Sequence, residues 1–439
     1  MNFSELKQTI AEKTPFFQTQ LAKVIQIPSI KSLGEDQAPF GRGPKAALET
    51  TLRIAQSFGL KTSQLSNQVG WAELPGKTAN YIAALGHLDV VAAPLTGWNS
   101  DPFQLTIKDD YMYGRGVLDN KGPIMGALFA LSLLKAEKLF PQHTIRVIFG
   151  TDEESGSADL KTYNSVEQPP LAGFTPDGKY PVVYAERGMV RLSLLIKIQD
   201  QSSLDIASID GEFSPSYLPD RVQLKFVSGQ RQTYSGIKTP SNAPDLGKNA
   251  LAALAQAQSS RTGKIGEAFK WLAAAATDTT GSQIGIGYVG KVSGKLQISV
   301  YGAAYLASTQ QLRVDFSIRY PIELTQEQLI QNLTKGLPTN SLLLVRQAVA
   351  PLYRDPQLPI IQKMSSIYES VTGLDGTPVT TTGITYARSL PNIVAFGPSF
   401  PGQRGIAHKE NEWLRISDWQ KIIAIEYLTL KSLAEMDFN

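Results

Sequence analysis

The change of residue pattern along the chain is the feature that most limits its fold. Up to residue 186, apolar runs such as "NYIAALGHL" and "TIRVIFG" alternate with helical patterns such as "PKAALETTLRIAQSFG" and "GPIMGALFALSLLKAEK". Apolar strands separated by helices are typical of an α/β layer fold with a largely buried sheet. In such folds the functional groups lie at the strand ends and in the loops that follow them.

A different pattern interrupts this alternation between residues 187 and 353. Segments such as "VRLSLLIKI", "RVQLKFVSG" and "QLRVDFSIRYP" alternate with a period of two, and the helical "GKNALAALAQAQ" lies among them, which predicts an α+β domain. After residue 354 the helices "QLPIIQKMSSIYESVTG" and "SDWQKIIAIEYLTLKSLAEM" restore the α/β pattern. We therefore expect one catalytic domain, formed by residues 1–186 and 354–439, with an α+β domain inserted at 187–353.

Composition excludes several classes of function. The 439 residues carry a net charge of +3 with no basic run, so neither a nucleic acid nor a membrane surface is expected as a partner. The chain has no cysteine, so any metal must be held by His, Asp and Glu. The N-terminal stretch lacks the apolar core of a signal peptide, and no apolar run approaches about 18 residues, so we expect a cytoplasmic protein.

The segment "GTDEESG" places three adjacent carboxylates, Asp152, Glu153 and Glu154, just after the apolar run "TIRVIF". Acidic residues after a strand are commonly a solvated turn or the start of a helix. Carboxylates are also what proteins gather around hard or borderline metal ions. The triplet alone favours the turn, and the rest of the chain must decide.

Only three histidines occur, at positions 87, 143 and 408, and two of them lie among acids. In "GHLDV", His87 and Asp89 are on the same side of a strand, which suits either a metal ligand with its orienting acid or a buried polar couple. Asp119 in "GRGVLDNKGP" could equally be a helix N-cap, and Asp177 in "FTPDGKYP" an ordinary turn residue. His143 begins a core strand without an acidic pattern, and we predict a structural role for it.

Seven motifs taken in order show a family resemblance over roughly residue 25 to the C-terminus. They are "GHLDVV", "WNSDPF", "YGRGVLDNKGP", "GTDEESG", "GFTPDGKYPVVYAERG", "GITYARSLPNIVAFGP" and "AHKENEW". The set resembles the di-zinc metallopeptidase family of PepV-type dipeptidases, carnosinases, glutamate carboxypeptidases and succinyl-diaminopimelate desuccinylases, and is most similar to the PepV-type dipeptidases. The resemblance implies an α/β/α metallopeptidase catalytic domain with an inserted α+β lid domain.

The resemblance also implies a ligand set for two Zn²⁺ ions, with Mn²⁺ or Co²⁺ as alternatives. His87 and Asp177 would be the terminal ligands of one ion, and His408 and Glu154 those of the other. Asp119 would bridge both ions. A bridging carboxylate holds two metals about 3.5 to 4 Å apart, where both can act on one reacting group.

Two further acids receive catalytic roles from the same resemblance. Asp89 would orient His87, and Glu153 would be the general base. Zinc lowers the pKa of its bound water towards about 7, and a nearby Glu can take the remaining proton and pass it to the leaving amine. We read Asp152 as a structural acid of the loop.

One position of the inserted domain departs from the family pattern. The family's lid histidine, which stabilises the oxyanion of the intermediate, is matched here by Pro240 in "GIKTPSNAPDLGKNA", and no histidine lies between residues 187 and 353. The lid asparagine is also changed, to Ser216, whereas the arginine of the "RYP" strand is kept as Arg319, a predicted substrate-binding residue. Loss of one oxyanion donor typically costs about 100- to 1,000-fold in turnover. Arg319, Lys238 or Thr239 could supply the donor instead.

The sequence thus predicts a metal-dependent hydrolase of dipeptides or short peptides, acting through a water activated by two zinc ions. Two alternatives stay open: an amidase or deacylase of N-acyl amino acids, and a peptide-binding homologue weakened in catalysis by Pro240. The length of the lid resembles the PepV arrangement and favours a monomer.

Overall fold

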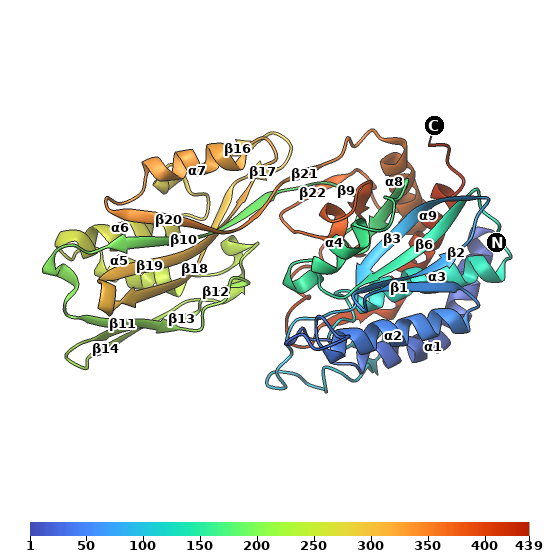
Figure 1. Cartoon of the computed structure of the whole chain (residues 1–439), viewed down its shortest axis with the longest axis horizontal. Coiled ribbons are helices and arrows are strands. Elements are labelled where there is room, and N and C mark those ends of the chain that lie inside the picture. Colours follow the sequence, from blue (N-terminus) through green and yellow to red (C-terminus); the bar gives the residue numbers. More distant parts are fainter. Residues whose placement is uncertain (439) are drawn as a thin grey trace. The chain divides into compact units, whose positions relative to one another are not determined.

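The computed structural model describes residues 1–438, which form two compact units (Figure 1). The first contains Met1–Tyr184, Arg354–Val379 and the chain from Ile384 onward, and the second contains Ala185–Tyr353 and Thr380–Gly383. The short segment 380–383 joins the second unit through hydrogen bonds: Arg319 donates to the carbonyl of Thr382, and the Thr382 hydroxyl donates to the carbonyl of Asn242. The sequence does not predict this return, because four residues carry no periodic pattern.

A mixed sheet is the centre of the first unit. Its order is β1 (Lys61–Leu65), β2 (Val69–Leu74), β6 (His143–Gly150), β3 (Thr78–His87), β7 (Ala172–Thr175), β23 (Ile393–Ala395), β9 (Val183–Glu186) and β21 (Leu352–Tyr353), with β22 (Val379–Thr381) paired to β9. Of these strands, β21, residues 185–186 of β9 and residues 380–381 of β22 are counted with the second unit. Strands β6, β3, β7 and β23 are parallel, whereas β1 and β2 pair antiparallel. The parallel strands are short runs of buried apolar residues, as expected for strands covered on both faces.

Helices cover this sheet on both faces (Figure 1). One face shares a single core with α1 (Phe3–Ile25), α2 (Arg42–Ser57), α3 (Lys121–Ala136), α8 (Pro359–Thr372) and α9 (Ile416–Leu433). On the other face, Trp71 of β2 packs edge-on against Tyr163 of the short helix α4 (Ala158–Asn164). Helix α3 is apolar and buried almost all round, which places it inside the core. The predicted α/β class with helices on both faces is confirmed.

Small sheets complete the first unit beside the main one. Strands β4 (Thr106–Lys108), β5 (Tyr111–Tyr113) and β25 (Trp413–Arg415) form one, and β8 (Gly178–Lys179) pairs with β24 (Pro398–Ser399) in another. The first of these ties the segment before α3 to the segment before α9, and both segments carry candidate ligands.

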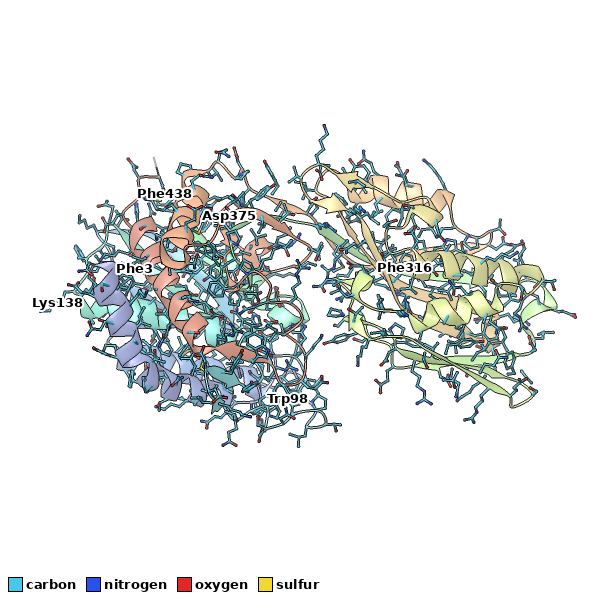
Figure 2. All side chains as sticks on the ribbon, turned by 180° about the vertical axis from the view of Figure 1, so that it is seen from behind. Phe3, Trp98, Lys138, Phe316, Asp375 and Phe438 are labelled. Atoms are coloured by element: carbon cyan, nitrogen blue, oxygen red, sulfur yellow. The ribbon has the colours of Figure 1, made fainter. Side chains whose placement is uncertain are left out.

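The second unit is an α+β structure with its own core. Its main sheet is antiparallel in the order β18 (Gln297–Leu306), β19 (Gln311–Tyr320), β10 (Gly188–Lys197) and β20 (Ser341–Val349), and it is accompanied by α5 (Ala250–Gln258), α6 (Gly263–Thr277) and α7 (Gln326–Lys335). The predicted alternation is present in β19, where Leu312, Val314, Phe316 and Ile318 are buried; Phe316 is labelled in Figure 2.

Three smaller sheets belong to the second unit. One contains β11 (Ile206–Gly211), β13 (Arg221–Phe226) and β14 (Arg231–Ser235). The others are the pairs β12 (Tyr217–Leu218) with β15 (Thr239–Pro240) and β16 (Val289–Gly290) with β17 (Gly294–Lys295). Across residues 1–438, none of the helices combines the length and the apolar character needed to cross a lipid bilayer.

Candidate metal centre

The candidate ligands come together because parallel strands end at one edge of the sheet. His87 is the last residue of β3, the acidic triplet begins two residues after the end of β6, and Asp177 lies two residues after the end of β7. His87 lies directly beside Gly150 in the register of β3 and β6. Asp119 arrives just before α3, and His408 arrives on the loop between β24 and β25. Residues far apart in sequence therefore share one small volume.

The Asp119 carboxylate lies between the two imidazoles. Its Oδ1 is 3.2 Å from Nε2 of His87, and its Oδ2 is 3.0 Å from Nε2 of His408. Each imidazole has a second carboxylate: Nε2 of His87 is 3.7 Å from Oδ1 of Asp177, and Nε2 of His408 is 2.9 Å from Oε1 of Glu154. The two oxygens of one carboxylate thus face two separate histidine–carboxylate pairs.

Burial and crowding shift the protonation of these groups. Burial raises the pKa of Asp177 to about 7, although its hydrogen bond to His87 acts in the opposite direction. Burial, followed by the charge of Asp177, raises the pKa of the Glu153 carboxyl well above its usual value. Burial lowers the pKa of His87, but the hydrogen bonds that His87 donates to Asp119 and Asp177 outweigh it and raise this pKa well above the usual range. The cluster therefore favours binding of positive charge.

The Asp89 carboxylate holds the acidic loop as well as the imidazole. Nδ1 of His87 is 2.9 Å from the backbone carbonyl of Asp89 and 3.5 Å from its carboxylate. The two carboxylate oxygens accept the backbone N–H groups of Glu153 and Glu154, at 3.2 Å and 3.0 Å. The imidazole is thus oriented chiefly through a backbone group, which the H-x-D spacing alone did not indicate, and the carboxylate fixes the two residues of the triplet that face the centre.

The third acid of the triplet is engaged away from the histidines. Asp152 accepts a hydrogen bond from Nζ of Lys31 at 2.6 Å and another from the backbone N–H of Ala158 at 3.0 Å. This is the structural role that we expected for it. His143, similarly, contacts the Thr78 hydroxyl and the carbonyl of Met436, and it lies at the opposite end of β6 from the acidic loop.

The residue that holds the Asp119 loop was not predicted from the sequence. The buried Glu412 accepts the backbone N–H groups of Gly116, Leu118 and Asp119 with Oε1, and its Oε2 is 2.7 Å from the guanidinium of Arg115. Glu412 lies in the motif "AHKENEW", four residues after His408. An acid beside a tryptophan in a loop carries no signal of its own, and only the adjacent motif could have drawn attention to it.

A second contact that was not predicted from the sequence holds the acidic loop through its backbone. Asp159 accepts the backbone N–H groups of Thr151 and Asp152 and the hydroxyl of Tyr386, at 2.6, 3.2 and 2.6 Å. The Tyr386 ring packs edge-on against His87 at 6.0 Å between centroids. One acid therefore connects the loop to an aromatic neighbour of the first histidine.

In the second unit, the residue at the lid-histidine position is part of a short ladder. Pro240 pairs with Tyr217 across β12 and β15, and the backbone N–H of Ser241 donates to the carbonyl of Ser216. The Thr239 hydroxyl is buried and donates to the carbonyl of Ala243, whereas the Lys238 ammonium lies over the Tyr217 ring at 5.2 Å. Of the expected donors in this segment, Lys238 is thus the exposed one.

The donor set fits divalent cations. Ligand atoms of His87, Asp119 and Glu154 lie within 4.8 Å of one another, and so do those of His87, Glu153 and Asp177. Imidazole nitrogens and carboxylate oxygens are ligands that zinc takes, and a second group of contacts that fixes the imidazole is typical of such sites. Asp119 offers one carboxylate oxygen to each histidine–carboxylate pair.

Comparison with known proteins places this geometry in a family. The model of "Peptidase family M20/M25/M40" matches residues 83–432. The chain belongs to this family. Its M20 membership agrees with the predicted resemblance, and it makes the protein a metallopeptidase by descent, with the candidate ligands within the matched region.

Relatives and solved structures extend the M20 comparison. The Bacillus subtilis protein named "Putative dipeptidase YtjP" is 29% identical over 431 residues, covering 90% of this chain and 92% of that protein. Human carnosine dipeptidase 1 has the same fold, with a TM-score of 0.61 at 16% identity over 98% of this chain and 99% of that one. The Bacillus subtilis YXEP protein, described as a dinuclear metal-binding M20 peptidase, aligns with a TM-score of 0.54 at 11% identity, covering 95% and 98%.

Proposed function

We propose that the protein hydrolyses the amide bond of dipeptides or short peptides with two divalent cations, Zn²⁺ first and Mn²⁺ or Co²⁺ as alternatives. The observation that carries the proposal is the Asp119 carboxylate, whose two oxygens face His87 and His408 at 3.2 and 3.0 Å. The relatives named as dipeptidases support it, as does a structural neighbour described as a dinuclear metal-binding peptidase. Asp177 would complete the His87 site, and Glu154 the His408 site.

In the proposed mechanism Glu153 moves the proton. When bound, the two cations would polarise the scissile carbonyl and lower the pKa of the attacking water. The Glu153 carboxylate lies within 4.8 Å of the ligand atoms of His87 and Asp177, so it can take a proton from a water held there and give it to the leaving amine. The Asp89 carboxylate keeps Glu153 in place by accepting a hydrogen bond from the backbone N–H of Glu153.

The test of the base compares Glu153→Gln with the native chain, both loaded with Zn²⁺ or Mn²⁺. We expect turnover of dipeptides to fall by about 100-fold or more, because general acid–base catalysis typically contributes about 10²–10⁴-fold. Metal content measured by elemental analysis should remain near two ions per chain. Turnover that survives the substitution would remove Glu153 from this role.

A panel of candidate compounds tests which class of substrate the protein hydrolyses. Free dipeptides, their N-acetyl derivatives and N-acyl amino acids are compared, and hydrolysis confined to the N-blocked compounds would replace the dipeptidase proposal by the amidase one. Pro240 favours a third candidate, a binder weakened in catalysis, because proline offers no side-chain donor for an oxyanion. Tight retention of a peptide without turnover of any compound would support that candidate.

Residues of the second unit complete the proposal. We include Arg319 as a substrate-binding residue and Lys238 as the replacement oxyanion donor. Arg319→Lys should raise KM for dipeptides, whereas Lys238→Met should lower kcat. Unchanged KM and kcat values in both variants would mean that neither residue of the second unit takes part in hydrolysis.

The proposal also includes a cytoplasmic monomer. A cysteine-free chain of 439 residues suits a reducing compartment but does not require one. The additional three-stranded sheet β11-β13-β14 makes the second unit larger than a single four-stranded layer, which supports a monomer by analogy. Light scattering on the purified chain measures the mass directly.

A further inference from the structure

A cavity lies in the first unit on the loop that carries His408. It has a volume of about 650 Å³, and its walls are residues of the 400–411 loop, β25 and the first turns of α9. Among the described residues, none of the proposed metal ligands and neither Asp89 nor Glu153 lines it. It is therefore a space distinct from the metal centre, although the two share the same loop.

The cavity is lined by more positive than negative charge. Arg404, Lys409, Arg415 and Lys421 line it, and the acids Glu410 and Asp418 do so as well. The Asp418 charge is compensated in place, because its carboxylate contacts Nζ of Lys421 at 3.1 Å and accepts a hydrogen bond from Gln403 at 2.9 Å.

Three of these cations lack a carboxylate partner. Within residues 1–438, no acid lies within 4 Å of the charged groups of Arg404, Lys409 or Arg415. Arg415 is held instead by aromatic rings: its guanidinium lies 5.3 Å from the Tyr111 centroid, and its Nε donates to the Tyr111 hydroxyl. The Glu410 side chain lies beside Gly97, a residue outside the cavity wall.

Apolar rings are part of the same wall. Phe400 and Trp413 line the cavity together with the basic residues, and the Lys421 ammonium lies 5.6 Å from the Phe400 centroid. Arginine and lysine beside aromatic surface bind phosphate or carboxylate groups that are attached to a carbon skeleton. A peptide bond without charge would leave these cations uncompensated.

From the cavity, its charge and its rings, we propose that the 400–421 region binds a small organic polyanion bearing phosphate or carboxylate groups. The ligand contacts Arg404, Lys409, Arg415 and Lys421. Because Gly405, Ile406, Lys409 and Glu410 line the cavity on both sides of His408 in sequence, occupancy also orders the loop that presents this histidine. The site is thus placed to influence the metal centre without being part of it.

The test uses the metal-free full-length chain, so that its outcome does not depend on catalysis or on chelation by the probe. Citrate and ATP are titrated separately by calorimetry in about 0.15 M NaCl. We expect one site per chain for at least one probe, with a Kd below about 1 mM, weakening as the salt concentration rises. Hydrogen exchange with that probe present should slow at the amides of residues 400–411.

Matched variants locate the site. Arg404→Gln together with Lys421→Gln should weaken binding at least about tenfold, and Arg404→Gln alone about threefold. Lys7→Gln with Arg53→Gln removes the same charge from exposed positions of α1 and α2 and should change nothing. Absence of binding by both probes, equal affinity in the Arg404/Lys421 double variant, or binding without protection of residues 400–411 would each overturn the proposal.

Discussion

Glu412 is a buried residue that fixes the position of a proposed metal ligand without being a ligand itself. Its Oε1 gathers three backbone N–H groups, among them that of Asp119, while its Oε2 neutralises Arg115. A carboxylate is the group that can accept all of these bonds at once. The position of the Asp119 carboxylate between the histidines therefore depends on a residue 293 positions away in sequence.

We expect Glu412→Gln to lower metal affinity by about 10- to 100-fold, the usual effect of losing a contact that orients a ligand. The amide of glutamine has no charge to pair with Arg115, and its NH₂ group cannot accept a hydrogen bond as the second carboxylate oxygen does. Competition with a chelator measures the affinity, and Glu410→Gln, an exposed acid on the same loop, is the control. Equal affinities in the native chain and Glu412→Gln would show that the loop holds Asp119 without this contact.

Glu426 on α9 supplies a second prediction, this time on stability. Both of its carboxylate oxygens are buried without a hydrogen-bond partner among the described residues, and burial raises its pKa well above 4.5. Its titratable neighbour is Tyr180, whose own pKa burial also raises well above the usual value. A raised folded-state pKa means that the stability contribution is complete below pH 4.5 and is lost as the pH rises towards the folded value.

Glu426→Gln should therefore stabilise the protein at alkaline pH and change little near pH 4.5. The gain grows by about 1.4 kcal/mol per pH unit until the folded pKa is reached. Urea unfolding at several pH values measures it, with the exposed Glu12→Gln as the control. If the difference in unfolding free energy between Glu426→Gln and the native chain did not change with pH, Glu426 would not have the raised pKa that this prediction requires.

At the scale of elements, the predicted pattern accounts for the strands and helices that build the site. The run "NYIAALGHL" lies in β3 except for its last residue, "TIRVIFG" lies within β6, and "PKAALETTLRIAQSFG" covers most of α2. The motifs predicted the residues that the strand ends bring together. They could not predict Glu412, Asp159 or the backbone contact of Asp89, because those contacts depend on loop geometry that periodicity does not encode.

Stacking between α1 and α3 gives an element-scale prediction with an adjacent control. Phe17 and Phe129 lie nearly parallel at 4.2 Å between centroids, and the side chain of Phe17 is 1% exposed. Phe17→Ala should reduce the free energy of unfolding by about 3–5 kcal/mol, since it leaves a cavity in the core. Phe16 is 49% exposed, so Phe16→Ala should reduce the free energy of unfolding by less than about 1 kcal/mol. Denaturant unfolding of both variants measures the contrast, and similar losses would mean that the core collapses around the gap.

At the scale of the whole molecule, the proposed ligands all belong to one of two separately packed units. His87, Asp119, Glu154, Asp177 and His408 lie in the first unit, and the buried apolar residues of the second unit's core run from Val190 to Leu333. The insertion was predictable from the interrupted pattern of the sequence. The return of residues 380–383 to the second unit was not, because it depends on contacts with Arg319 and Asn242.

This separation predicts where metal binding increases stability. A ligand at about 100 times its Kd stabilises the structure that binds it by about 2.7 kcal/mol. With Zn²⁺ or Mn²⁺ present, amide exchange should therefore slow in β3, β6 and α3 of the first unit and remain unchanged in β10 and β19 of the second. Asp119→Ala, which removes the carboxylate between the histidines, should abolish the protection in the first unit. Equal protection of both units by metal would show that the two cores unfold as one cooperative structure, and protection that survives Asp119→Ala would place the ions elsewhere.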